Sequence, residues 1–397
     1  MKDKALLEGW NKINITKVFT QISTTGKNIA TKDCLSVGKY PVIDQGAEYI
    51  SGYFNDETKV IPVENKVIVF GDHTRNFKLI DFDFIVGADG VKIFQPVKDI
   101  DPDFFYYQCL SLNLPNKGYH RHFRYLKECD FIYPSFSQQQ KLAKKFTVLL
   151  SQVAEIKQRL EKIPALLKTY RQSVLARAVN GELSAKWREE NGVSLESWVY
   201  EKAQHICDKV QSGSTPKGNP FEQNGTIPFL KVYNIVNQEL NFDYKPQFVT
   251  KEQHSQRSIT LPNDVLMNIV GPPLGKVAIV TNQYSEWNIN QAITLFRCNP
   301  RNLHYKFFYF VLREGRFIRE IEHDLKGIVG QINISLSQCR DMIVPVPTLE
   351  EQNYITQAVE KHLNFANQLE AQVNAALERV NLMTQAILAK GFRGELL

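Results

Sequence analysis

The stretch "KGYHRHFRYLK" (117–127) places cationic side chains among aromatic ones in a turn-rich segment. Ammonium and guanidinium groups neutralise phosphates, and guanidinium groups also hydrogen-bond to the edges of bases. We therefore expect this segment, together with the earlier loop "GDHTRN" (71–76), to contact nucleic acid. The residues predicted for this contact are His73, Arg75, Lys117, His120, Arg121, His122 and Arg124.

A second group of polar loops lies in the later half of the chain. It comprises "SGSTPKGN" (212–219), "KVYN" (231–234), "GPPLGK" (271–276) and "NINQ" (288–291). Amide side chains in such loops suit two-point hydrogen bonding to purines, and lysines suit phosphates. The residues predicted here are Ser214, Thr215, Lys217, Lys231, Asn234, Lys276, Asn290 and Gln291.

Motifs for catalysis or metal binding are missing from the sequence. "GPPLGKV" (271–277) is one residue short of a P-loop and has Val277 where a magnesium-binding Ser or Thr should stand. "GNPF" (218–221) is not accompanied by a glycine-rich cofactor loop, and no HExxH or GxSxG occurs. The six cysteines are scattered without a CxxC pair. We predict no catalytic residue, no metal site and no cofactor in this chain.

These loops belong to a sequence that repeats itself. "NGEL" (180–183) recurs as "RGEL" (393–396), and the ungapped match extends back over residues 134–183. Fainter matches follow in the same order, with "LEGW" (7–10) recurring as "LESW" (195–198) and "DFFYYQCL" (103–110) as "KFFYFVL" (306–312). Repetition at a fixed order predicts two copies of one architecture.

Both copies of the repeated segment have the apolar spacing of a long helix with a heptad seam. The first seam runs from Leu142 to Val174 and the second from Ile355 to Ile387. Capping boxes are predicted at Ser135 with Gln138 and at Thr348 with Glu351, and Gly181 and Gly394 are predicted stops. The favoured arrangement is an antiparallel coiled-coil pair within one chain; the alternative is two ordinary amphipathic helices in separate domains. Pro164 predicts a kink in the first helix.

The segments between the helices contain short β-rich runs bounded by Gly, Pro, Asn and Asp. They are "KVIVF" (66–70), "FDFIVG" (82–87), "VKIFQ" (91–95), "IPFLKVYNI" (227–235), "KVAIV" (276–280) and "AITLF" (292–296), and a helix is expected at each aromatic run, 104–107 and 307–310. The predicted fold class is α+β, with two mixed α/β domains joined by two long antiparallel helices in an internal pseudo-twofold repeat. The predicted boundaries are 1–133, 134–190, 191–343 and 344–397.

The net charge of +6 is unevenly distributed. Residues 134–190 carry 11 basic and 5 acidic side chains, whereas residues 344–397 carry 4 and 6. Opposite charges favour pairing of the two helices, and the basic helix is either a solvated face or a surface for a phosphate backbone. Because the sequence has neither a long apolar run nor an apolar signal core, we expect a cytoplasmic protein without a membrane span.

The order of these segments, with "PTLEEQNYI", "IPALLKTYRQSVLARAVNGEL", "SAKW" and "GSTP…IPFLKVYNI", resembles the specificity subunit of type I restriction-modification systems. The resemblance covers essentially the full chain. It implies two target recognition domains, each reading half of a bipartite site in double-stranded DNA, and helices that set the spacer between the half-sites. The first helix departs from the family phrase P-L-x-E-Q, because it reads "PSFSQQQ".

The resemblance also implies partners. Two methyltransferase subunits, which would carry S-adenosylmethionine, are expected to bind the helical regions, with restriction subunits attached in some complexes. The expected contact residues are Gln139, Leu142, Gln352 and Ile355. Two other functions remain open: a coiled-coil assembly scaffold that never touches DNA, and the recognition part of a fused restriction or methylation enzyme. Binding to duplex DNA separates the scaffold from the others, and methyl transfer by the chain alone identifies the enzyme.

Overall fold

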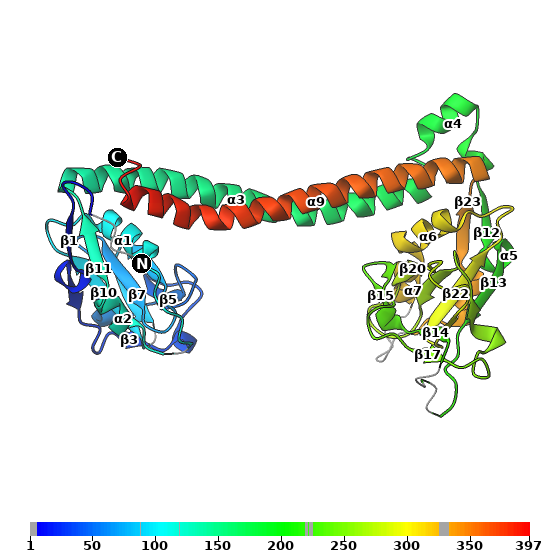
Figure 1. The fold of residues 1–397 in the computed structure, drawn as a ribbon, viewed down its shortest axis with the longest axis horizontal. Helices are drawn as coiled ribbons and strands as arrows, with labels where there is room; N and C mark the ends of the chain where they lie inside the picture. The colour runs from blue at the N-terminus through cyan, green and yellow to red at the C-terminus, as the bar shows by residue number, and fades with distance from the viewer. Residues whose placement is uncertain (1–5, 88, 119, 219–220, 222–224, 325–332) are drawn as a thin grey trace. The chain divides into compact units, whose positions relative to one another are not determined.

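The computed structural model describes residues 6–87, 89–118, 120–218, 221, 225–324 and 333–397. The chain forms two compact units, which Figure 1 draws as a ribbon with labelled elements. Unit 1 comprises Met1–Lys162 with Val373–Leu397, and unit 2 comprises Ile163–Gln372. Among the described residues, no helix is long and apolar enough to cross a membrane.

Unit 1 contains a two-stranded ribbon, a four-stranded antiparallel sheet and a five-stranded mixed sheet. The ribbon pairs β1 (Asn11–Asn14) with β11 (Asp130–Tyr133). The four-stranded sheet has the order β2 (Phe19–Ile22), β10 (Val91–Pro96), β7 (Val67–Gly71), β8 (Phe77–Ile80). The mixed sheet has the order β3 (Asn28–Ile29), β9 (Phe84–Gly87), β4 (Tyr40–Ile43), β5 (Gly52–Phe54), with β6 (Val60–Ile61) also on β9. The helices are α1 (Pro102–Ser111), α2 (Phe123–Lys127) and the short η1 (Ile15–Lys17), η2 (Thr31–Asp33) and η3 (Glu57–Lys59).

Unit 2 repeats this plan with its own strands. Its ribbon pairs β12 (Val199–Lys202) with β23 (Ile343–Val346). Its antiparallel sheet has the order β13 (Cys207–Ser212), β22 (Ile293–Cys298), β19 (Val265–Asn268), β20 (Val277–Ile279). Its mixed sheet has the order β17 (Phe248–Val249), β14 (Ile227–Leu230), β21 (Trp287–Ile289), β18 (Ile259–Thr260), beside the hairpin β15 (Ile235–Val236) and β16 (Glu239–Leu240). The helices are α4 (Ala185–Asn191), α5 (Ala203–Ile206), α6 (Tyr305–Glu314), α7 (Arg316–Asp324), α8 (Leu336–Asp341), η4 (Leu195–Ser197), η5 (Val232–Asn234) and η6 (Gln256–Ser258).

The internal repeat is therefore present in the topology. In each unit the central pair of the mixed sheet is parallel, β4 with β9 and β14 with β21, while a third strand joins antiparallel. All six predicted β-rich runs contain strands, and the aromatic runs lie in α1 and α6. Phe105 on α1 packs on Phe19 of the sheet, and Phe308 on α6 packs on Phe296. These aromatic side chains fill the space between sheet and helix, because each buries a large apolar area.

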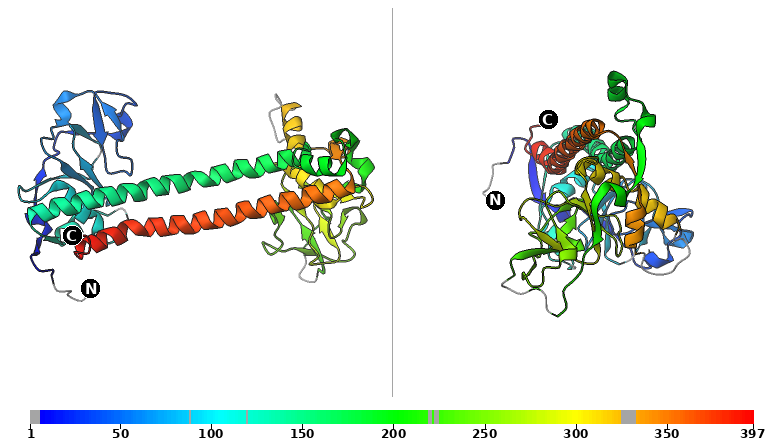
Figure 2. Two further views of the ribbon diagram at one scale, coloured as in Figure 1. Left: turned by 90° about the horizontal axis from the view of Figure 1, so that it is seen from above. Right: turned by 90° about the vertical axis from the view of Figure 1, so that its right-hand side faces the viewer.

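Two helices of 44 residues, α3 (Phe136–Val179) and α9 (Leu349–Phe392), each contribute one part to both units. Within each unit they lie side by side and run antiparallel, as Figure 1 and the left view of Figure 2 show. In unit 1 the rings of Phe146 and Phe392 lie 5.2 Å apart. In unit 2 the Tyr170 hydroxyl lies 2.7 Å from His362 Nδ1, and Arg171 pairs with Glu370 at 2.7 Å. The favoured arrangement, an antiparallel helix pair within one chain, is therefore confirmed.

The heptad seams follow the sequence pattern with two exceptions. Ile156 is 44% exposed and Met383 is 40% exposed, although both occupy predicted seam positions. The helix α3 continues through Pro164, and the kink expected there stays a prediction. Gly181 and Gly394 follow the helices with φ of 84° and 77°, the left-handed conformation that glycine adopts without steric cost.

Candidate nucleic-acid interface

In unit 1, four loops gather at one place. The tip of the β7–β8 hairpin, residues 72–76, contacts residues 114–118 and 120–122, because His122 donates its backbone N–H to the Asp72 carbonyl at 2.7 Å. The Arg75 guanidinium donates to the Leu114 carbonyl at 3.1 Å. The loop 44–48 joins them through Gln45, whose side-chain oxygen accepts from the His73 N–H at 3.2 Å. The turn 89–90 completes this set, which we name the unit 1 loop cluster.

Most of the predicted unit 1 residues are on the surface of this cluster or on the adjoining helix α2. Lys117, His120, Arg121 and Arg124 are exposed, and His73 and Arg75 are half-buried. The Arg124 guanidinium lies over the Tyr125 ring, 4.5 Å from its centroid, which orders a long cationic side chain at the surface. These six side chains therefore remain predicted DNA contacts.

His122 does not fit its predicted role. Its side chain is fully buried, with Nδ1 3.0 Å from the Asp72 carbonyl oxygen, and Nε2 accepts the Lys117 N–H at 3.4 Å. The Asp72 carboxylate in turn accepts the Phe123 N–H at 2.7 Å. His122 therefore holds the loop 114–122 on the hairpin tip and offers no surface donor for a phosphate or a base.

In unit 2, the loop after β13 packs on the turn after β21. Gly213 allows this approach, because a Cβ there would lie 2.1 Å from the Ile289 carbonyl oxygen. The hydroxyls of Ser214 and Ser258 form a hydrogen bond at 3.0 Å. The Thr215 hydroxyl donates to the Gln291 amide oxygen at 2.7 Å. The structure thus brings together Ser214, Thr215, Asn290 and Gln291, which came from two separate sequence motifs. We name this set the unit 2 loop cluster.

Lys231 adjoins the unit 2 loop cluster, since the Asn290 N–H donates to the carbonyl of the preceding Leu230 at 3.1 Å. Its ammonium lies 4.1 Å from the Phe221 ring centroid, and burial lowers the pKa of this lysine below its ordinary value. Lys217 is exposed. Lys276 is not part of this cluster. It directly precedes β20 of the antiparallel sheet, and its N–H donates to the Asn268 side chain at 2.7 Å.

Asn234 is a second residue whose predicted role is not supported. It is fully buried, and its amide nitrogen donates to the carbonyls of Asn241 and Tyr244 at 3.1 and 3.0 Å. Its side-chain oxygen accepts the Lys231 N–H at 3.0 Å. Every hydrogen-bonding group of this amide is used within the loop, so Asn234 positions its neighbours and does not face a base.

The four residues expected to bind a partner are also buried inside the chain. Leu142 lies in the hydrophobic core of unit 1 and Ile355 in that of unit 2, and both side chains are 0% exposed. Gln139 accepts the Asp101 N–H at 2.9 Å and donates to the Asp99 and Pro134 carbonyls at 3.2 and 3.1 Å. Gln352 does the same in unit 2 with His304, Asn302 and Pro347. The two glutamines therefore attach each globular part to the start of its long helix.

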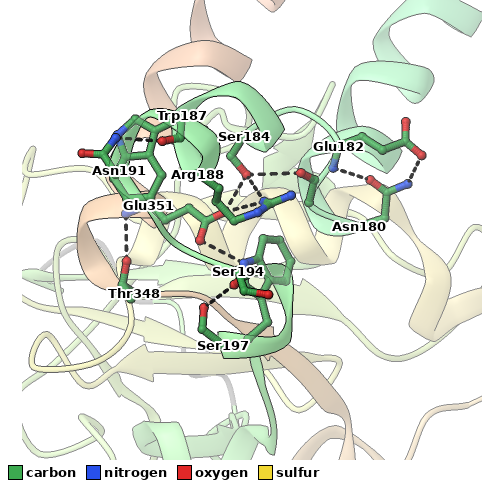
Figure 3. Close-up of polar contacts among 12 residues, drawn as sticks. Asn180, Glu182, Ser184, Trp187, Arg188, Asn191, Ser194, Ser197, Thr348 and Glu351 are labelled. Atoms are coloured by element: carbon green, nitrogen blue, oxygen red, sulfur yellow. Dashed lines mark hydrogen bonds and ion pairs between the residues drawn. The ribbon is translucent and has the colours of Figure 1, made fainter.

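The start of α9 holds a buried carboxylate that the sequence analysis placed in a capping box. Thr348 accepts the Glu351 N–H at 3.3 Å, but the Glu351 carboxylate points to Arg188 and Ser184 instead of to the helix end (Figure 3). The Arg188 guanidinium and the Ser184 hydroxyl donate to one carboxylate oxygen at 2.7 Å each, and the Trp198 indole N–H donates to the other at 2.9 Å. This network fixes α4 and Trp198, the residue before β12, to the first turn of α9.

Some residues that belong to the two clusters or support them had no signal in the sequence. Gln45 and Lys78 connect loops that are about 30 residues apart, and Arg257 donates to the Ser212 hydroxyl at 3.0 Å from η6. Gly213 was the detectable one, because a glycine between two polar loops can mark a close backbone approach. Among the residues that the structure describes, no three His, Cys, Asp or Glu side chains are grouped to hold a metal.

The repeated units, their loop clusters and the two long helices define a class of tandem α+β protein with two similar units and a shared pair of long helices. The model of the type I restriction modification DNA specificity domain matches residues 7–165 and 196–379, so that one match lies mostly in unit 1 and the other mostly in unit 2. The chain belongs to this family.

Curated relatives agree with this assignment. The type I restriction enzyme EcoBI specificity subunit of Escherichia coli is 31% identical over an alignment of 277 residues, and the match covers 66% of this chain and 57% of that protein. The StySPI specificity subunit of Salmonella potsdam is 31% identical over 274 residues, with the same coverage. This chain thus spans little more than half the length of these relatives.

Two solved structures share the fold. One is a chain from a structure that concerns complex assembly and conformational transition of the type I R-M system. It has a TM-score of 0.70 at 17% identity, and the match covers 99% of this chain and all of that one. The HsdS subunit from Thermoanaerobacter tengcongensis has a TM-score of 0.62 at 17% identity and 99% coverage of both chains. At this identity the likeness concerns the fold alone.

Proposed function

We propose that this chain is the non-catalytic DNA-reading subunit of a type I restriction-modification complex. Each unit presents one loop cluster to one half of a bipartite site in double-stranded DNA, and the recognition domains correspond to residues 1–133 and 191–343. The observation that carries the proposal is the double match to a DNA specificity domain, together with a loop cluster in each unit: exposed cationic side chains in unit 1, and hydroxyl and amide side chains beside Lys231 in unit 2. Different loops on one repeated frame suit an asymmetric site.

The partners in this proposal are two methyltransferase subunits, which bring S-adenosylmethionine, and restriction subunits where the system has them. The complex would act on chromosomal DNA in the cytoplasm. Because Gln139, Leu142, Gln352 and Ile355 are buried, partner contacts are assigned to other side chains of the helices. The length of α3 and α9 is proposed to set the spacer between the half-sites.

The experiment that tests this proposal is methylation profiling. The full chain is produced with methyltransferase subunits of its system, and modified adenines in host DNA are located by single-molecule sequencing. A single bipartite motif with a fixed spacer is expected. Replacing residues 1–140 with those of another family member, so that Gln139 stays with its partners, should change one half of the motif only.

Three other outcomes would overturn the proposal in different ways. A purified complex that binds no duplex DNA would indicate an assembly scaffold. Methyl transfer by the chain alone would indicate an enzyme. A change in both half-sites after exchange of residues 1–140 would contradict the division of reading between the units.

A further inference from the structure

The loop 44–48 of unit 1 closes around a buried lysine. Lys78, on β8, is 5% exposed, and its ammonium donates to the carbonyls of Asp44 and Glu48 at 2.9 and 2.5 Å. It also lies 3.5 Å from the Asp44 carboxylate. Burial lowers the pKa of Lys78, and the Asp44 charge opposes that shift. Its polar contacts are thus with one loop of its own chain.

Three glycines leave room for this loop. A Cβ on Gly71 would lie 2.8 Å from Gln45 Cβ, one on Gly87 would lie 3.1 Å from Asp44 Cβ, and one on Gly90 would lie 3.1 Å from the Gln45 side-chain oxygen. Asp44 also accepts the Gly46 N–H at 2.8 Å, which tightens the turn. The loop therefore has one well-defined place against β7, β9 and the turn 89–90.

From that place, Gln45 holds the rest of the unit 1 loop cluster. Its backbone carbonyl accepts from the Thr74 hydroxyl at 2.5 Å and from the Asn76 amide at 3.1 Å. Its side chain accepts the His73 N–H and donates to the Asp89 carbonyl, both at 3.2 Å. A shift of Gln45 would move the hairpin tip 72–76 with it.

The fold itself does not need a lysine at this position. Lys78 pairs with Val69, which pairs with Ile93 on β10. The matching row in unit 2 joins Leu295 and Leu266 to Ala278, which is fully buried. A buried ammonium costs desolvation free energy that an apolar side chain avoids. Of the two matching positions, only the one in unit 1 has a lysine, and the loop 44–48 that Lys78 holds accounts for this difference.

Resting on the proposed function, we propose that Lys78 is a positioning residue for DNA recognition: it fixes the loop 44–48 and, through Gln45, the hairpin tip 72–76, and so determines base preference in one half-site without touching DNA. A buried ammonium with three oxygen partners is not available to a phosphate. Its effect on binding is therefore one of shape and independent of salt.

The test compares Lys78→Met with Lys98→Met, which removes an exposed lysine of the same unit. Each variant is assembled with its methyltransferase subunits, and affinity for the cognate site and for random duplex is measured across salt concentrations. For Lys78→Met we expect the ratio of cognate to random affinity to fall about tenfold, comparable to one mismatched base pair. The slope of log affinity against log salt should be unchanged. Lys98→Met should leave the ratio as it was.

The half-sites provide the decisive readout. Substituted bases should become tolerated in the half-site read by unit 1 and remain excluded in the other, which also reports that unit 2 is folded. If Lys78→Met does not assemble, Lys78→Ala carries the small side chain that unit 2 has at this position and gives the same comparison.

Two results would overturn the inference. One is an unchanged base preference with Lys78→Met or with Lys78→Ala. The other is a salt slope smaller by about 1 for a Lys78 variant, which would make Lys78 a phosphate contact. A wild-type complex without any sequence preference would instead refute the proposed function itself. The two failures are therefore distinguishable.

Discussion

The Glu351 carboxylate is a buried charge held by several side chains at the start of a long helix. Its side chain is fully buried, and Arg188, Ser184 and Trp198 donate to it. Removing one partner of such a pair leaves the other charge buried without compensation. Glu351→Gln should therefore lower the free energy of unfolding of unit 2 by about 3–5 kcal/mol.

The matched control for that variant is Glu155→Gln, which removes the partner of Arg159 in an exposed pair on α3. Its effect should not exceed about 0.5 kcal/mol, because exposed i,i+4 pairs contribute little. Chemical denaturation followed by circular dichroism measures both. Equal effects of the two variants would mean that the Glu351 network does not stabilise the junction.

The exposed Arg121 of the unit 1 loop cluster and Arg124 of the adjoining helix α2 lead to a prediction about salt. Arg121→Ala with Arg124→Ala should weaken DNA binding and reduce the magnitude of the salt slope by about 1 for each phosphate that is no longer neutralised. His122→Ala is the contrasting variant, because His122 is buried on Asp72 and should act through stability. Fluorescence anisotropy across salt concentrations checks both. An unaltered slope for the arginine pair would place that surface away from DNA.

At the scale of single residues, the sequence indicated which loops are polar better than it indicated which of their side chains reach the surface. Histidine and asparagine in polar loops looked like surface donors, yet His122 and Asn234 are buried. Their burial depends on tertiary contacts, since His122 meets Asp72 from 50 positions away in the chain. Gln139 and Gln352 were misjudged for the same reason, because their hydrogen bonds are to loops about 40 and 50 residues earlier. No local pattern contains such pairings.

The elements themselves followed from local sequence patterns. A spacing of three and four predicted both 44-residue helices, and short β-rich runs bounded by Gly, Pro, Asn and Asp predicted six of the strand segments. The exposed Ile156 and Met383 mark the limit of that argument, since a seam position is buried only where the partner helix supplies a facing side chain. The short strands β3, β6 and β17 had no sequence signal at two residues each.

The helices also allow a test of the spacer. One heptad inserted in α3 between Leu149 and Val153 preserves the seam and adds roughly 10 Å. The matching insertion belongs between Met383 and Ile387 of α9, in unit 1, because His362 lies opposite Tyr170 and not opposite Leu149. Roughly 10 Å corresponds to about 3 base pairs and a rotation of about 100°.

The lengthened protein should therefore stop methylating sites with the original spacer. Single-molecule sequencing of host DNA makes the measurement, and co-purification with the methyltransferase subunits serves as the control for assembly. Continued modification at the original spacing by an assembled complex would show that helix length does not set the spacer.

At the scale of the whole molecule, residues near the two ends of the sequence meet within unit 1. A Cβ on Gly394 would lie 2.8 Å from the Leu7 side chain, and Lys145 donates to the Leu396 carbonyl at 2.5 Å. Joining the termini and reopening the chain between Gly192 and Leu195 should therefore give a folded protein that supports methylation at the original site. Gly192 already has the left-handed conformation of a turn, with φ of 64°.

Thermal melting and methylation profiling check this permutant against the parent chain. An unchanged motif is the expected result, because both loop clusters keep all their contacts. A permutant that folds but modifies sites with only one conserved half would contradict the prediction, and it would indicate that the segment 192–195 must be continuous for unit 2 to read DNA.

Unit 1 is assembled from two distant stretches, and this has a consequence for synthesis. Leu388 is fully buried in its core, and the Phe392 ring packs on Phe104 and Phe146. A ribosome adds roughly 5–20 residues per second, so roughly 10 to 40 seconds separate residue 162 from residue 373. Unit 2 is one continuous stretch, residues 163–372, and its residues have all been made before those helical turns exist. The unit that is begun first is thus the last to be completed, and its apolar face stays uncovered while the rest of the chain is made.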